Sequence, residues 1–346
     1  MQYLRKLRNL SSIIGLDGFV VAVVIAIFLA WLVPGTGAKE GPLTLRTAAH
    51  YGISVVFFFY GVGLSRAKFV ANMGNFRLHV LIQLTTFLVF PLIGLGLYSL
   101  FASDADRDLW LGVFFLTALP STVSTSVVMV SLARGNLPAA IFNASLSSVL
   151  GILITPIWMS LFLATSNGDF NLLGSMIDLT FVVILPIGLG MLFNPTKFGH
   201  WIAKKRRLVN YFDQSVVLLI VHTSFCDSFA HQVFADCTFA KLAALCAFLL
   251  LLFFTMYGLI LLACRMLKFN REDSITALFC GSKKSLMHGV TMSKVLFRGN
   301  AAVGMIVLPL MLYHALQLII AGVIARSIQK RYDVSLSLEA EKGDGS

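Results

Sequence analysis

The fold is decided by the stretch Phe279-Cys280-Gly281-Ser282-Lys283-Lys284-Ser285-Leu286-Met287-His288-Gly289, in the middle of an apolar run at 273–297. Two lysines at the centre of a membrane helix would each cost ~2.5–3.5 kcal/mol on insertion. The run could instead be shifted so that the amines reach a lipid interface. About ten residues separate the pair from each end of the run, and adjacent side chains cannot both extend the same way. We therefore expect a broken helix with at least one amine facing a polar cavity.

The composition places the whole chain in a bilayer. Of 346 residues, 58% are hydrophobic and 12% are charged, against about 25% charged in soluble proteins. The net charge of +11 comes from basic residues in short segments between apolar runs. That arrangement is typical of cytoplasmic loops and not of a nucleic-acid groove. We expect a multi-pass protein in contact with lipid, with no nucleic-acid partner.

Ten runs are long enough to cross a membrane. They are 16–34, 46–64, 78–101, 109–132, 138–164, 174–193, 211–232, 240–265, 273–297 and 301–326. With the N-terminus inside, nineteen Lys and Arg fall in inner connections and five in outer ones, as the positive-inside rule requires. We therefore place both termini in the cytoplasm. We expect the protein to lie in the plasma membrane, which in a bacterium is the inner membrane.

The chain reads as two copies of one five-span unit. Arg134-Gly135-Asn136 and Arg298-Gly299-Asn300 fall at the same point of the same helix order, 164 residues apart. The predicted units are 14–164 and 174–326, followed by a polar cytoplasmic tail at 327–346. An odd number of spans per unit makes the second copy inverted. The basic start and first apolar run resemble a signal peptide, but this run has a counterpart in the second copy.

The fourth span carries a second interruption, which matches the one in the ninth. The repeat offset places Lys284 over Pro120, and proline followed by hydroxyls predicts a broken helix. Two broken spans that cross would place half-helix ends and unwound carbonyls at one site, for an anionic solute or a bound cation. The candidate residues here are Pro120, Ser121, Thr122, Ser124, Thr125, Ser126, Ser282, Lys283, Lys284 and Ser285.

Further polar side chains lie inside the spans. Gln83 and Asn143 are candidates because an amide is costly in lipid, and His288 could bind solute or relay a proton. Hydroxyls in the other spans are more often packing groups than ligands. In the tenth span, which also contains Gln317, His314 could likewise relay a proton or be a hydrogen-bonded structural histidine. No Asp or Glu lies in the middle of a span, although sodium and proton sites usually contain one. The five cysteines show no metal-binding spacing, so we expect no cofactor, sodium being the one ion considered.

These motifs resemble the bile acid:sodium symporter family. The resemblance rests on the Pro-Ser-Thr break, on Ala133-Arg134-Gly135-Asn136 and on the segment 150–156, Leu-Gly-Ile-Leu-Ile-Thr-Pro. The segment 279–286 is similar to the sodium/bile acid cotransporter 7-like branch. The resemblance covers roughly residues 14 to 330. It implies a core domain with crossed fourth and ninth spans, and a panel domain of spans one, two, six and seven.

The resemblance fails where the family binds sodium. The family's ninth-span break carries Glu-Thr-Gly-Met-Gln, and this chain has 281–285, Gly-Ser-Lys-Lys-Ser, at about that point. The family's Ser-Asn pair falls on Thr125 and Ser126, and its third-span glutamine corresponds to Gln83. A sodium ion held by these three residues would lack the acid and both amides of the two breaks. Bile acid as the solute has no support from the residues.

We predict an all-α secondary transporter of a small organic, anionic solute that works by alternating access. A lysine in the ninth break would replace a sodium ion, or couple transport to protons by releasing and rebinding one. The alternative is a non-transporting or proton-coupled membrane protein that regulates ion uptake, for example of calcium. An intramembrane enzyme is excluded, because the spans carry no HExxH, GxSxG or pair of carboxylates. The oligomeric state is left open.

Overall fold

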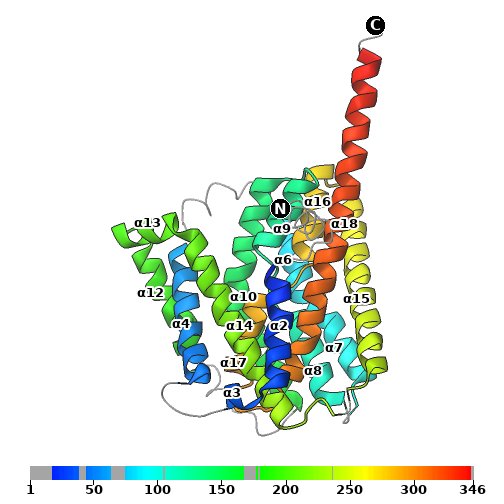
Figure 1. Cartoon of the computed structure of the whole chain (residues 1–346). Helices are drawn as coiled ribbons and strands as arrows, with labels where there is room; N and C mark the ends of the chain where they lie inside the picture. The colour runs from blue at the N-terminus through cyan, green and yellow to red at the C-terminus, as the bar shows by residue number, and fades with distance from the viewer. Residues whose placement is uncertain are drawn as a thin grey trace, which may run out of the picture.

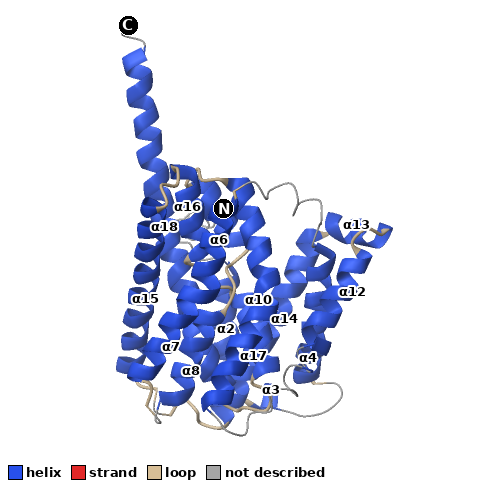
Figure 2. Cartoon of the chain, turned by 180° about the vertical axis from the view of Figure 1, so that it is seen from behind, coloured by secondary structure: helices blue, strands red, loops and turns tan. Residues whose placement is uncertain are grey.

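The protein is a bundle of helices in a computed structural model that describes residues 18–38, 44–63, 75–103, 106–166, 177, 180–235 and 237–343 (Figures 1 and 2). Over these ranges there is no strand. The chain start, and the first residues of the first and sixth predicted spans, lie outside the described residues. The elements are α2 (Gly18–Leu32), α3 (Gly35–Ala38), α4 (Leu45–Gly63), α6 (Phe76–Leu84), the π-helix η1 (Thr85–Val89), α7 (Phe90–Phe101), α8 (Arg107–Ala118), α9 (Ser124–Leu132), α10 (Leu137–Ser166), the π-helix η3 (Thr180–Ile184), α12 (Leu185–Phe193), α13 (Lys197–Lys204), α14 (Arg206–Ala230), α15 (Phe239–Met266), α16 (Arg271–Gly281), α17 (Leu286–Leu296) and α18 (Val303–Gly343).

Four stretches are long and apolar enough to cross a bilayer unbroken. They are Phe76–Phe101, Leu137–Leu163, Phe239–Met266 and Val303–Tyr332. Shorter apolar helices occupy Gly18–Leu32 and Thr180–Phe193. These helices confirm a multi-pass membrane protein. The assignment of ten crossings in two inverted units stays a prediction at this point.

Two of the predicted spans are each divided into two helices. α8 ends at Ala118 and α9 begins at Ser124, while α16 ends at Gly281 and α17 begins at Leu286. Leu119, after α8, is extended at φ −75° and ψ 154°, and Ser285 caps α17 by accepting from His288 N. By contrast, Pro156 and Pro309 lie inside α10 and α18, which run on without a break. Proline alone therefore does not decide where a span unwinds.

The last helix is longer than its predicted span. α18 runs to Gly343 and projects beyond the rest of the bundle (Figure 1). Residues 327–343 of the predicted polar tail thus continue α18 as helix, and the cytoplasmic location of the tail stays a prediction. Good helix formers such as Leu, Glu, Ala and Lys fill this stretch, so α18 has no reason to end at the membrane edge.

α4 and α12 pack backbone against backbone through glycines. A Cβ at Gly61 would lie 2.2 Å from Ile187 O, and one at Gly190 would lie 2.1 Å from Phe58 O. Neither neighbour is a side chain that can turn away. Small residues of this kind let membrane helices approach closely.

Gly190→Ala is expected to lower the free energy of unfolding by about 1–3 kcal/mol, because the two backbones must separate to admit the methyl group. Gly188→Ala, on the same helix with open space around its Cβ, is the matched control and should be neutral or slightly stabilising. Thermal unfolding of both variants in one detergent checks this. Equal melting temperatures for the two variants would contradict the packing described here.

Candidate functional site

The two breaks contact each other directly. Ser285 N donates to Pro120 O at 2.9 Å, and Ser126 Oγ, in the first turn of α9, donates to Phe279 O at 3.0 Å. Lys283 and Lys284 are both fully buried. Neither amine therefore reaches a lipid interface, and Pro120 and Ser126 of the first break contact Ser285 and Phe279 of the second.

Lys284 is bound by backbone oxygens from two separate parts of the chain. Its Nζ donates to Thr86 O at 2.9 Å, to Thr117 O at 2.7 Å and to Leu119 O at 2.8 Å. The same atom lies 4.1 Å from the centre of the Phe90 ring, within cation–π distance. An ammonium has three N–H groups, so every donor of Lys284 has an acceptor.

The helices leave these carbonyls open for a physical reason. Thr117 and Leu119 lie at the C-terminal end of α8, where carbonyls have no intrahelical partner and the dipole is negative. Thr86 lies in the π-helix before Pro91, and proline has no N–H to offer a preceding carbonyl. Phe87 O, the next one along, is satisfied by Trp158 Nε1 at 2.8 Å. Lys284 thus binds carbonyls at the C-terminal end of a half-helix, in keeping with the unwound carbonyls that the sequence predicted beside the half-helix ends.

Two side chains of α18 satisfy the backbone of the second break. Gln317 accepts from Lys284 N and donates to Lys284 O, both at 2.8 Å. Tyr313 donates its hydroxyl to Ser282 O at 2.7 Å. Tyr313 was missed from the sequence, and Gln317 was noted as a polar residue of the tenth span without an assigned role. The signal that could have identified both is a pair of polar side chains one helical turn apart in an otherwise apolar span.

Lys283 is bound much less completely. Its Nζ donates to Thr125 O at 3.0 Å and lies 5.8 Å from the centre of the Phe279 ring. Within the part of the chain that the structure describes, this is its single hydrogen bond, so two donors of a buried ammonium remain. Thr125 belongs to the first turn of α9, whose end carries a partial positive charge. Lys283 therefore lies beside the first turn of α9 with a carbonyl oxygen as its partner.

The hydroxyls after the first break form a chain. Thr125 Oγ1 donates to Thr122 Oγ1 at 2.8 Å, and Thr122 Oγ1 lies 2.7 Å from Ser126 Oγ. Ser121 N donates to Ser147 Oγ at 2.9 Å. Ser124 is exposed on α9, outside this chain of hydroxyls, and its place in the site stays a prediction.

The remaining candidates lie beside the breaks. Gln83 Nε2 donates to Asn143 O at 3.3 Å and to Asn143 Oδ1 at 3.2 Å, which links α6 to α10. Asn143 Nδ2 in turn lies 2.8 Å from His79 Nδ1. His288 Nδ1 lies 3.0 Å from Ser285 Oγ, and its ring meets Tyr60 edge-on at 5.4 Å. His288 therefore joins the second break to α4.

A sodium ion does not fit the carbonyl cluster at Lys284, because the ammonium already occupies it. The hydrogen bonds of Gln83 run to α10, those of Thr125 and Ser126 to Thr122 and Phe279. Thr125 and Ser126 are thus linked through Thr122, and Gln83 makes its hydrogen bonds to another helix. The Lys284 ammonium is itself the cation that these three carbonyls bind.

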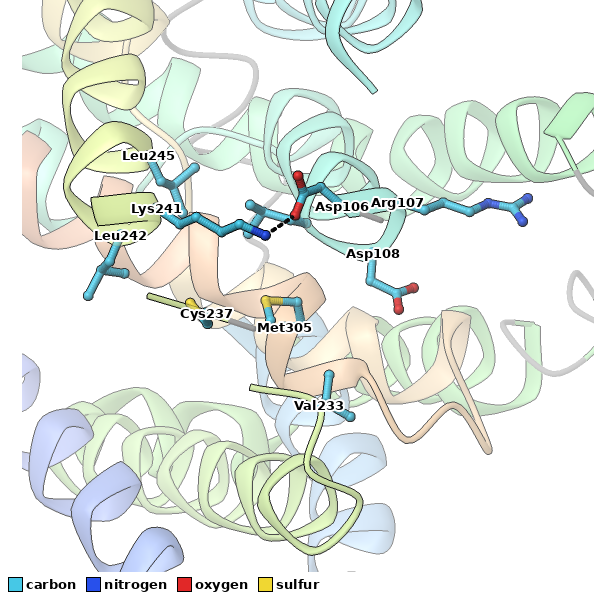
Figure 3. Close-up of a pocket in the computed structure, with 10 residues that line it drawn as sticks. Asp106, Arg107, Asp108, Val233, Cys237, Lys241, Leu242, Leu245 and Met305 are labelled. Carbon is cyan, nitrogen blue, oxygen red and sulfur yellow. Dashed lines mark hydrogen bonds and ion pairs between the residues drawn. The ribbon is translucent and has the colours of Figure 1, made fainter. Parts of the chain in front are cut away.

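A pocket of about 110 Å³ lies elsewhere, where the first turn of α8 meets α15 and α18 (Figure 3). Lys241 reaches across it to Asp106, with Nζ 3.0 Å from Oδ1. Both side chains are partly exposed, and exposed pairs contribute little to stability. This pocket shares no residue with the two breaks.

The chain is similar to known proteins over nearly its whole length. The model of the SBF-like CPA transporter family matches residues 17–330. "Uncharacterized protein PA2026" of Pseudomonas aeruginosa is 36% identical over 94% of this chain and 96% of its own. "Putative symporter YfeH" of Escherichia coli is 32% identical over 91% of this chain and 94% of its own. "Sodium/bile acid cotransporter 7" of Mus musculus is 30% identical over 90% of this chain and 92% of its own.

These matches confirm the resemblance seen in the broken spans, and the exclusion of an enzyme, since the family is one of transporters. They also agree with the helices in giving a multi-pass membrane protein. On the match across residues 17–330, this chain belongs to the SBF-like CPA transporter family.

Proposed function

We propose that the protein is a secondary active transporter that carries a small organic anion by alternating access at the crossing of the two breaks. The observation that carries the proposal is the ammonium of Lys283. It is fully buried, and within the described residues it has one hydrogen-bond partner, the carbonyl of Thr125 in the first turn of α9. A buried charge of this kind is costly unless a counter-charge arrives, and the carboxylate or sulfonate of a solute would supply one.

Helix pairing supports ten crossings in two inverted units. The first and seventh predicted spans pack together as α2 and α14, and the sixth and second pack as α12 and α4. A two-fold axis that exchanges the units converts one pair into the other. The same operation relates the pair α9 and α10 to α17 and α18, and the pair α7 and α8 to α15 and α16. We propose that α2, α4, α12 and α14 form a panel and that the other long helices form a core.

Three features favour an organic anion over a cation as the solute. The candidate site residues include two lysines and no carboxylate. Lys284 is satisfied by carbonyls, which leaves Lys283 as the group with donors to spare. The chain Thr122–Thr125–Ser126 adds hydroxyls that could donate to solute oxygens. We place the protein in the plasma membrane with both termini cytoplasmic, as the distribution of Lys and Arg favours.

Uptake of radiolabelled organic anions into proteoliposomes tests the proposal, with a proton gradient or a sodium gradient imposed. Lys283→Ala is expected to reduce uptake at least about tenfold, since a charge-assisted hydrogen bond contributes ~1.5–3 kcal/mol. Its thermal stability should be retained, because the variant removes a poorly compensated buried charge. Lys241→Ala, at the pocket of Figure 3, is the matched lysine control and should transport as the parent does.

Two results would count against this function. Uptake by Lys283→Ala equal to the parent would remove Lys283 from the site. No flux of any anion by the purified parent, under either gradient, would favour the non-transporting regulator of ion uptake.

A further inference from the structure

We infer that Lys284 is a covalently attached substitute for a bound monovalent cation, and that its three carbonyl ligands form a latent cation site which the chain fills with its own ammonium. The inference deepens the proposed function by assigning a reason why the chain would need no sodium ion at this point. Its physical content, a cation site, does not require that transport occur.

The oxygen cluster has the chemistry of a cation site. Thr86 O, Thr117 O and Leu119 O lie 2.7–2.9 Å from a single point. Backbone carbonyls that converge in this way replace the hydration shell of alkali ions in selective channels. The C-terminal dipole of α8 adds negative potential, and the face of Phe90 lies at 4.1 Å. Carbonyl dipoles and an aromatic face provide the whole compensation, because no acidic side chain contacts Nζ within the described residues.

The location of the cluster makes the cation structurally necessary. The three oxygens come from the π-helix of the third predicted span and from the end of α8, and the lysine comes from the break between α16 and α17. Without a positive charge at this point, three carbonyls would remain buried with their shared donor gone. A single cation therefore holds three segments of the predicted core in register.

Removing the side chain tests whether the site is latent. Lys284→Ala should leave a vacant carbonyl cluster large enough for a small cation. In choline chloride at constant ionic strength, we expect its melting temperature in detergent to fall by at least about 5 °C, given three unsatisfied carbonyls. Titration with sodium, potassium, lithium or methylammonium should then raise the melting temperature with saturation, as a ligand that binds only the folded state does.

Three matched proteins complete the test. The parent should show the same melting temperature in choline, sodium, potassium and lithium chloride. Lys283→Ala should also be insensitive to the choice of cation, because its loss exposes a single carbonyl. Lys284→Gln keeps hydrogen-bond donors without the charge, and it should remain less stable than the parent in every salt.

The inference is overturned by any of three results. These are a Lys284→Ala protein that no small cation stabilises over choline, a Lys284→Gln protein as stable as the parent, or a parent that sodium stabilises over choline. If Lys284→Ala cannot be purified, the parent and Lys284→Gln decide the matter by themselves. Because every measurement is made in detergent, a cation-dependent Lys284→Ala would stand even if no proteoliposome took up an anion. If Lys284→Ala shows no cation dependence, the inference fails, and the uptake assay still tests the role of Lys283 separately.

Discussion

Gln317→Leu is expected to lower the free energy of unfolding by about 2–6 kcal/mol. The amide of Gln317 satisfies both Lys284 N–H and Lys284 C=O, each at 2.8 Å, and all three groups are buried. Each backbone group left buried without a partner costs ~1–3 kcal/mol. The position of Lys284 depends on the same amide, so uptake should fall together with stability.

Gln83→Leu is the matched control for this prediction. Gln83 is also an amide inside a predicted span, but it donates weakly to Asn143, at 3.2 and 3.3 Å, and its own oxygen is buried without a partner in the described structure. Its replacement should cost less than that of Gln317. Thermal and denaturant unfolding in one detergent, with parent, Gln83→Leu and Gln317→Leu side by side, measures the difference. A Gln317→Leu protein as stable as Gln83→Leu would contradict the role of Gln317 in satisfying the backbone of the second break.

The sequence predicted where the breaks lie because the residues there disfavour a helix by themselves. Proline with following hydroxyls, and two lysines in an apolar run, are local signals. Pro156 and Pro309 show the limit of this reasoning, since both lie inside intact helices. The second break has no proline and depends on Tyr313 and Gln317 from another helix. Such compensation is a tertiary property that no local pattern carries.

The different environments of the two lysines could not be predicted from their order in the chain. Lys284 has three acceptors because η1 and Pro91 leave Thr86 O open and because α8 ends at Ala118. Lys283, one residue away, points to the first turn of α9. The way in which the two breaks contact each other decides which partner each lysine has. The repeat offset placed the breaks opposite each other but carried no information on side-chain direction.

Asp227→Ala is expected to have the other large effect, a loss of about 3–5 kcal/mol in the free energy of unfolding. Asp227 of α14 binds Arg46 of α4, and its Oδ2 lies 3.9 Å from Lys294 Nζ of α17. The side chains of Asp227 and Lys294 are 14% and 18% exposed. Removing one partner of such a pair leaves the other charge buried and uncompensated, which is the costly case.

A double-mutant cycle separates the pair from other effects of the substitution. Lys294→Met removes the buried charge and keeps an apolar chain of similar length, so Asp227→Ala combined with Lys294→Met should be more stable than Asp227→Ala alone. Additive losses in the double variant would show that Asp227 and Lys294 are not coupled. Arg46 and Asp227 belong to the proposed panel, and Lys294 to the proposed core. A coupled pair would therefore join the two parts that move in the proposed alternating-access cycle, and uptake by Lys294→Met would change even where its stability does not.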